Sequence, residues 1–212
     1  MSMMELIVSG WPAQAITAAA QLGIADALAD GPLPLDELAR RLDVDADALG
    51  RLLRALIGRG IFRRRRDGRY ALNSLAASLR SDAPISLKGA ALFQGSQEQR
   101  ERWTLLADSV RSGQSIVPAL RGKDGFDYLD DIPEHADLFN QTMTALAQMT
   151  HAVVVGSYDF SPYRTIVDVG GGQGALLAAV LASAPSSRGV LYDLPQVVVD
   201  APKILRDNAI AD

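Results

Sequence analysis

The segment TIVDVGGGQGALLAAVLASAP, residues 165–185, constrains the fold of this chain more than any other. A mostly apolar run ends at Val169, four glycines and one glutamine occupy residues 170–174, and an alanine-rich stretch follows. This pattern predicts a strand, a tight turn and a helix that stops at Pro185. Because a second apolar run, GVLYDL, comes directly afterwards, we predict one β-α-β unit.

The glycine turn predicts a cofactor site. Gly170, Gly172 and Gly174 occupy alternate positions. Residues without side chains adopt positive φ at low cost and let a ligand touch the backbone, and the helix that follows offers unpaired N–H groups. Asp193 ends the second strand at the distance where an open α/β sheet places a carboxylate on ribose hydroxyls.

Two cofactors and one structural role are consistent with this turn. Gly170, Gly172 and Ala175 satisfy the dinucleotide pattern G-x-G-x-x-G/A, so NAD is one candidate. With Asp168 the segment reads D-x-G-x-G-x-G, which resembles the S-adenosylmethionine loop of methyltransferases. A carboxylate there attracts a cationic amine and sulfonium but repels a pyrophosphate, by up to several kcal/mol in a cleft. The third interpretation is a turn that serves only strand-helix packing.

The N-terminal part of the chain is predicted to be helical. Apolar spacing indicates a helix from Trp11 to Leu28, a second over 36–42 and a third over 45–59. We expect Asp45 to cap the start of the third helix and Gly60 to cap its end.

A hairpin and a long helical tract are expected next. RDGRY predicts a turn at Asp67-Gly68 between two short strands, which completes a helix-turn-helix with a wing. Residues 76–155 are predicted to be helical, with loops near SDAPIS and GKDGFDYLDDIPE. The run Arg63–Arg66 on this wing suggests contact with nucleic-acid phosphate. However, the helix before it begins with Asp45 and Asp47, which disfavours DNA, so a solvated or partner-facing strand is the preferred interpretation.

Several segments together resemble one enzyme family. The chain resembles bacterial and plant O-methyltransferases, which have similar segments in the same order, at LGIADAL, GFDYLDDIPEHADLFNQTM and IVDVGGGQGALLAAVLASAPSSRGVLYDLPQVVVDAP. The resemblance implies a mainly α N-terminal winged-helix dimerisation domain (1–100), helices on the substrate side (101–160) and the first β-α-β part of an α/β Rossmann-like methyltransferase domain (161–212).

The resemblance also implies which residues form the site. The expected cofactor-binding residues are Asp168, Gly170, Gly172, Gly174, Asp193 and Leu194. Phe139, Asn140 and Met143 are expected on a helix beside the substrate; helix packing for Phe139 and Met143, and capping or solvent exposure for Asn140, are the alternatives. Ala147 stands where many plant members have a serine, which affects one polar contact to the cofactor.

No catalytic base is expected within this sequence. O-methylation is helped by a histidine that takes the substrate hydroxyl's proton. Only His135 and His151 are present, and a structural or surface role is preferred for both. The resemblance implies that the base, like the remaining strands, lies beyond Asp212, so we expect an inactive fragment.

Composition completes the sequence-based hypothesis. The chain has a formal net charge of −4 and no cysteine, which disfavours nucleic acid as a partner, excludes thiolate metal sites and suits the cytoplasm. No membrane segment and no metal are expected. The hypothesis is an S-adenosylmethionine-dependent O-methyltransferase, a homodimer through its N-terminal helices, acting on a hydroxyl of a small aromatic or polyketide-like molecule. The alternatives are a non-catalytic dimerisation or interaction module, a winged-helix DNA-binding regulator and an NAD-binding protein.

Overall fold

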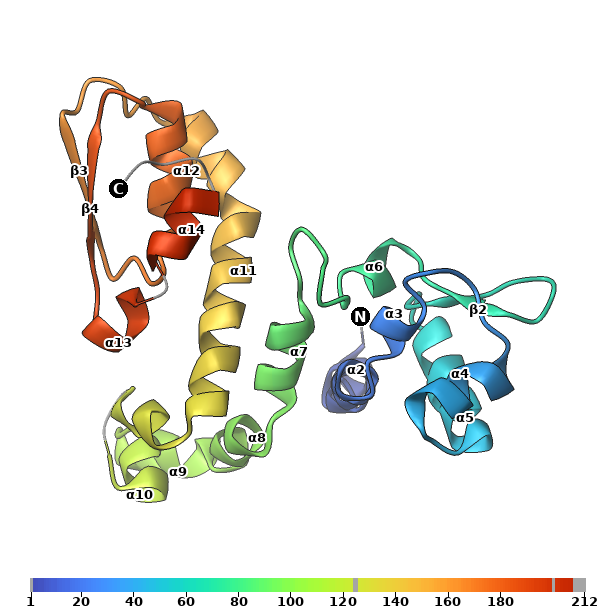
Figure 1. The fold of residues 1–212 in the computed structure, drawn as a ribbon. Coiled ribbons are helices and arrows are strands. Elements are labelled where there is room, and N and C mark those ends of the chain that lie inside the picture. The colour runs from blue at the N-terminus through green and yellow to red at the C-terminus, as the bar shows by residue number, and fades with distance from the viewer. Residues whose placement is uncertain (1, 124–125, 200, 208–212) are drawn as a thin grey trace. The chain divides into compact units, whose positions relative to one another are not determined.

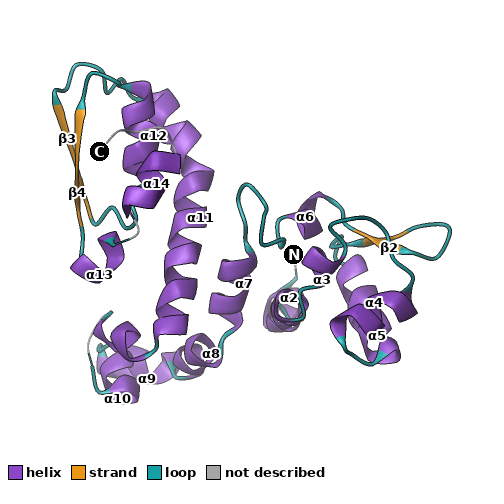
Figure 2. Ribbon diagram, in the orientation of Figure 1, coloured by secondary structure: helices purple, strands orange, loops and turns teal. Residues whose placement is uncertain are grey.

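The computed structural model of the chain describes residues 2–123, 126–199 and 201–207. The chain forms two compact units, Met1–His135 and Ala136–Asp212. Most described residues of the first unit are helical, whereas the second contains a parallel strand pair (Figures 1 and 2).

The first unit is a series of short helices interrupted by one hairpin. Its elements are α1 (Met3–Ile7), α2 (Gly10–Gln21), α3 (Ile24–Ala27), α4 (Leu35–Leu42), α5 (Ala46–Ile57), β1 (Arg63–Arg64), β2 (Tyr70–Ala71), α6 (Ser74–Ala77), α7 (Lys88–Gly95), α8 (Gln97–Thr104), α9 (Leu106–Ser112), α10 (Val117–Arg121) and the 3-10 helix η1 (Asp127–Asp131).

The helix boundaries correct two expectations. The helix predicted from Trp11 to Leu28 is broken at Gly23, which adopts φ 67° and separates α2 from α3. Helix α5 begins as predicted, since the Asp45 carboxylate accepts the N–H of Ala48 at 2.7 Å. It ends earlier than predicted, because Gly58 is the C-cap and Gly60 lies in the following turn with φ 77°.

The core of the first unit lies among α2, α3, α4 and α5. Leu49, Leu53 and Leu56 recur at intervals of four and three residues on α5, and all three are buried. They pack with Ile24 and Leu38 in one hydrophobic cluster. Burying each such side chain contributes about 1.5–3 kcal/mol, so this cluster holds the helices together.

Helices α2 and α7 approach each other closely at Gly95. The Thr17 hydroxyl on α2 lies 3.0 Å from the carbonyl oxygens of both Ala13 and Ala91, so it can donate to α7. A Cβ atom on Gly95 would lie 1.9 Å from Thr17 Oγ1 and 2.6 Å from Thr17 Cβ. The crossing therefore requires glycine at position 95.

The hairpin predicted around Asp67-Gly68 is confirmed. Strands β1 and β2 are antiparallel, with Arg64 opposite Tyr70. Gly68 has φ 83°, a conformation that glycine adopts without strain. Tyr70 also exchanges two backbone hydrogen bonds with Leu33, of 2.8 and 3.0 Å, which attaches the hairpin to the segment before α4.

The second unit begins within the longest helix. Its elements are α11 (Pro133–Ser157), β3 (Thr165–Val169), α12 (Ala175–Ser183), β4 (Arg188–Tyr192), α13 (Pro195–Val198) and α14 (Ala201–Asp207). Pro202 lies in the first turn of α14, where its missing N–H costs no helical hydrogen bond.

The predicted β-α-β unit is confirmed. Strands β3 and β4 pair in parallel, with Val167 opposite Val190, and α12 packs against β4 (Figure 1). A Cβ on Gly189 would lie 2.6 Å from Leu181 Cδ1, so glycine permits close contact between strand and helix. The other face of the pair exposes apolar side chains, those of Val167, Val169, Val190 and Tyr192.

The division into units falls at a different place from the predicted domain boundaries near residues 100 and 160, which stay predictions. Among the residues that the structure describes, no helix is both long enough and apolar enough to cross a lipid bilayer.

Candidate cofactor site

The glycine turn joins the end of β3 to the start of α12. Gly170, Gly172 and Gly174 have φ of 71°, 59° and 81°, and Gly174 is the N-cap residue of α12. A Cβ at Gly170 or Gly172 would have no atom within 4 Å. These two glycines are therefore required by backbone conformation, and the space beside them is open to a ligand.

A fourth glycine is required for a different reason. A Cβ on Gly171 would lie 2.5 Å from the carboxyl carbon of Asp168 and 2.6 Å from Leu191 Cδ1. The sequence prediction did not include Gly171. The available signal was that the turn contains four glycines although D-x-G-x-G-x-G needs only three.

Asp193 connects the end of β4 to the glycine turn. Its Oδ2 accepts the N–H of Gly172 at 2.7 Å, and its Oδ1 accepts the N–H of Leu194 at 2.7 Å. The N–H of Gly170 donates to the carbonyl oxygen of Tyr192 at 2.8 Å. Because a carboxylate has about four acceptor positions, Asp193 can still accept two hydroxyl groups.

Asp168 carries an unsatisfied oxygen. Its Oδ2 is buried and has no hydrogen-bond partner among the described residues. Burial raises the pKa of Asp168, and the negative charge of Asp193 raises it further. A buried carboxylate oxygen without a donor is costly, so this site favours a proton or a cationic donor.

The three residues predicted to border the substrate lie on α11, in the same unit as the glycine turn. Phe139 and Asn140 are half-buried, and Met143 is exposed. Phe139, Met143 and Ala147 follow one another at intervals of four residues, so they share one face of the helix. Their role at the substrate stays a prediction.

Both histidines have lowered pKa values, which favours the neutral form of each imidazole. His135 is 4% exposed, and its ring packs against Phe93 with the ring centres 4.7 Å apart. Burial lowers the pKa of His135, although the Glu98 carboxylate, 4.0 Å from Nδ1, opposes that effect. Burial also lowers the pKa of His151. Neither Nε2 has a hydrogen-bond partner among the described residues, and neither imidazole is assigned as the base.

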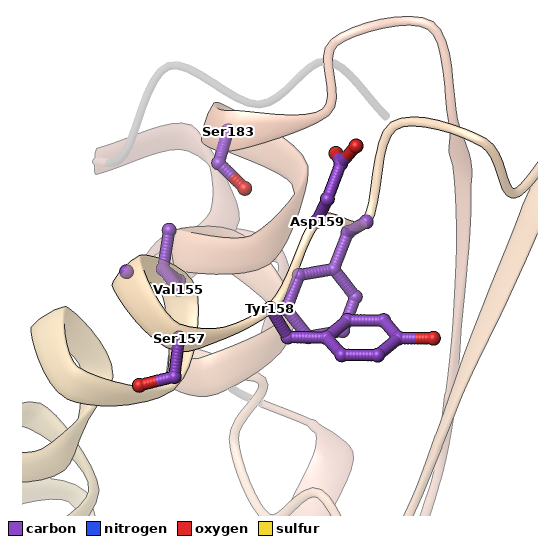
Figure 3. Close-up of a pocket in the computed structure, with 7 residues that line it drawn as sticks. Val155, Ser157, Tyr158, Asp159 and Ser183 are labelled. Atoms are coloured by element: carbon purple, nitrogen blue, oxygen red, sulfur yellow. The ribbon is translucent and has the colours of Figure 1, made fainter.

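A separate hollow lies at the other end of the strands. Its volume is about 350 Å³, and residues 155–160 together with Ser183, on the last turn of α12, line it (Figure 3). The Asp159 carboxylate there already accepts the N–H and hydroxyl of Ser161, at 3.0 and 2.7 Å. The glycine turn is at the first turn of α12, so this hollow is distinct from the candidate cofactor site.

Comparison with known families identifies the chain. A family model described as an O-methyltransferase domain matches residues 103–211. The chain belongs to the O-methyltransferase family. A second model, described as the O-methyltransferase dimerisation domain, matches residues 4–82. The family predicted from the sequence segments is thereby confirmed.

Individual relatives agree with this membership. The O-methyltransferase chain is 36% identical over 210 residues to the phenazine O-methyltransferase PhzM of Lysobacter antibioticus, which covers 99% of the chain and 61% of that relative. The crystal structure of LaPhzM superposes with a TM-score of 0.91 at 36% identity, covering 99% of this chain and 63% of that one.

The structure of a further relative contains a methyl donor and an aromatic ligand. The neocarzinostatin O-methyltransferase NcsB1 was crystallised in complex with S-adenosylmethionine and 2-hydroxy-5-methyl naphthoic acid. It matches with a TM-score of 0.70 at 29% identity, over 93% of this chain and 61% of that one. The chain thus spans about 60% of the length of the relatives it matches.

The described residues contain no group of three or more His, Asp or Glu side chains arranged to hold a metal ion. The expectation of a metal-free site stays a prediction.

Proposed function

We propose that this O-methyltransferase moves a methyl group from S-adenosylmethionine to a hydroxyl of a small aromatic or polyketide-like molecule. The observation that carries the proposal is the buried, unpartnered Oδ2 of Asp168 beside an open glycine turn. A cationic cofactor satisfies that oxygen, whereas the pyrophosphate of NAD would be repelled by it. Family membership supports the same cofactor.

Five of the predicted site residues have a specific role in this proposal. Asp168 accepts from the cofactor's ammonium group, and Gly170 and Gly172 let its methionine end lie against bare backbone. Asp193 accepts the two ribose hydroxyls with the acceptor positions that the backbone N–H groups leave free. Leu194 follows Asp193 and is 49% exposed, so its side chain is available to the cofactor.

The chemistry requires positioning above all. When bound, S-adenosylmethionine supplies an electrophilic methyl group on a sulfonium. Asp168 and Asp193 fix the cofactor at two points, which orients it toward an acceptor held along the Phe139, Asn140 and Met143 face of α11. Holding two reactants in line can account for about 7–11 kcal/mol of the barrier.

A homodimer is part of the proposal. The match to the dimerisation domain over residues 4–82 supports it. Exposed apolar side chains on α1 and at Trp11, which is 76% exposed, offer a surface for a second copy. We propose that α4, α5 and the β1–β2 hairpin form a winged helix within this dimerisation domain. We also propose that the enzyme is cytoplasmic, since a chain without cysteine suits a reducing compartment. The homodimer is tested by light scattering, which should give the mass of a dimer. A monomeric mass at all concentrations would contradict the proposed homodimer.

Calorimetric titration separates the cofactor candidates. We expect S-adenosylhomocysteine, which keeps the ammonium and ribose groups, to bind the chain, and NAD not to bind. Tight binding of NAD would overturn the proposal, because it would mean that the turn accepts a pyrophosphate beside Asp168.

Replacement of Asp168 by asparagine should weaken cofactor binding and stabilise the fold. We expect affinity for S-adenosylhomocysteine to fall about tenfold or more, because a charged hydrogen bond is lost. Unfolding free energy at pH 7 should rise by up to about 1 kcal/mol after solvent screening, because a partly buried charge is removed.

The pH dependence gives an independent check on Asp168. Because folding raises the pKa of Asp168 above 3.8, the folded chain binds this proton more tightly than the unfolded chain. Asp168 should therefore contribute a loss of stability as pH rises from about 3.8 through its raised pKa, and the difference between the stability–pH curves of the native chain and of Asp168→Asn should show that contribution. Asp127→Asn, at an exposed site in the first unit, is the matched control and should leave both properties unchanged.

A further inference from the structure

Positive charge is concentrated in one part of this acidic chain. Residues 48–81 contain nine arginines and one aspartate, a net charge of +8, so the rest of the chain carries −12 to give the total of −4. Six of these arginines lie on the hairpin or just before it. We call them the arginine surface: Arg59, Arg63, Arg64, Arg65, Arg66 and Arg69.

The arginine surface is exposed and incompletely neutralised. All six side chains are exposed, and the hairpin's one carboxylate, Asp67, bonds Arg69 at 2.8 Å and approaches Arg65 at 3.9 Å. Arg64 lies over the Tyr70 ring, 5.8 Å from its centre. Arg59, Arg63 and Arg66 form no ion pair with any described carboxylate.

This arrangement does not serve the stability of the hairpin. Consecutive like charges repel one another, and a solvated strand needs no such density of guanidinium groups. The buried residues that attach the hairpin, Phe62 and Tyr70, carry no charge. An external anion would relieve the repulsion.

We propose that the arginine surface binds an acidic protein partner, one that presents a row of carboxylates to it. Guanidinium groups bind carboxylates through two parallel hydrogen bonds, and a row of them gives both attraction and register. An acidic helix with a carboxylate at every third or fourth residue presents such a row along one of its faces.

Duplex DNA fits this surface less well. Asp45 caps the start of α5 and Asp47 lies in its first turn, whereas the arginine surface follows its end. Since α5 has twelve residues, it is about 18 Å long, so the acids at its start and Arg59 just after its end lie within the footprint of a duplex. Phosphates along that length would meet carboxylates, while a compact acidic protein can contact the hairpin alone.

Single strands and membranes lack their usual contacts. Nucleic-acid single strands are held by exposed aromatic rings, but Phe62 and Tyr70 are 2% and 7% exposed. The loop between the strands, Arg65–Arg69, has no apolar side chain that could insert into a bilayer.

The test is a titration monitored by fluorescence anisotropy. The chain is titrated into a labelled glutamate-rich helical peptide, labelled duplex DNA, and vesicles of phosphatidylcholine with phosphatidylserine. The test variant carries Arg59→Gln, Arg63→Gln and Arg66→Gln. The control variant carries Arg111→Gln, Arg188→Gln and Arg206→Gln, which removes the same charge from exposed positions elsewhere. Thermal melts establish that both variants fold.

We expect the peptide to bind the native chain at low salt, to be released at high salt, and to bind the test variant about tenfold less tightly, while the control variant keeps most of the affinity. Tighter binding to DNA or to the vesicles would overturn the proposal. So would no binding of the peptide, equal losses in both variants, or self-association of the native chain that the test variant abolishes, since the occupant would then be a second copy.

Discussion

Replacement of Gly95 by alanine is expected to destabilise the first unit by about 3 kcal/mol or more. The added methyl group would lie within 2.6 Å of three Thr17 side-chain atoms, one of them the Cβ atom that is bonded to the α2 backbone. Rotating the Thr17 side chain cannot remove that contact, so α2 and α7 must move apart. Urea unfolding, followed by helical circular dichroism, measures the loss.

Gly10→Ala is the matched control for this experiment. Gly10 begins α2, and a Cβ there would meet no atom within 4 Å. Alanine is the better helix former, so this change should be neutral or stabilise by up to about 1 kcal/mol. Equal stability of the Gly95 and Gly10 variants would show that α2 and α7 do not cross as closely as described.

Replacement of Asp193 by alanine is expected to weaken S-adenosylhomocysteine binding about 100-fold or more. The change removes the proposed ribose acceptor and leaves the N–H groups of Gly172 and Leu194 without their partner. Each charged hydrogen bond contributes about 1.5–3 kcal/mol, so the losses combine to this magnitude. Calorimetric titration of the native and variant chains provides the measurement.

Two further readouts separate a binding role from a structural one. Asp193→Asn keeps one acceptor oxygen and should bind with intermediate affinity. Because the charge of Asp193 raises the pKa of Asp168, removing it should lower the pKa of Asp168, which carboxyl NMR titration can follow. If Asp193→Ala bound cofactor as the native chain does, the site would be vestigial and the interaction-module hypothesis would replace ours.

Several predictions succeeded because the signal is local. Alternating glycines predict positive φ, and Gly170, Gly172 and Gly174 all have it. The β-α-β unit follows from a change of periodicity within thirty residues, and Asp67-Gly68 is a strong turn signal. The Asp45 cap depends only on the next three residues.

Other predictions failed where neighbouring signals competed. Gly23 continues the apolar spacing of α2, but its positive φ ends the helix. Gly58 and Gly60 both lie near the end of α5, and the C-cap is Gly58, whereas Gly60 has positive φ in the turn that follows.

The sequence was sufficient for the family, the hairpin, the β-α-β unit and the conformation of the glycine turn, because each depends on motifs or on neighbours a few residues apart. Three features could be found only from the folded chain. They are the close contact at Gly95, the need for glycine at 171, and the difference in hydrogen bonding between the carboxylates of Asp168 and Asp193. Asp193 accepts a hydrogen bond from Gly172, 21 residues away in the sequence, while Asp168 has a buried Oδ2 without a hydrogen-bond partner among the described residues. Burial and hydrogen bonding are set by segments distant in the chain, so the charge that is available to a ligand emerges only when β3, β4 and α12 pack together.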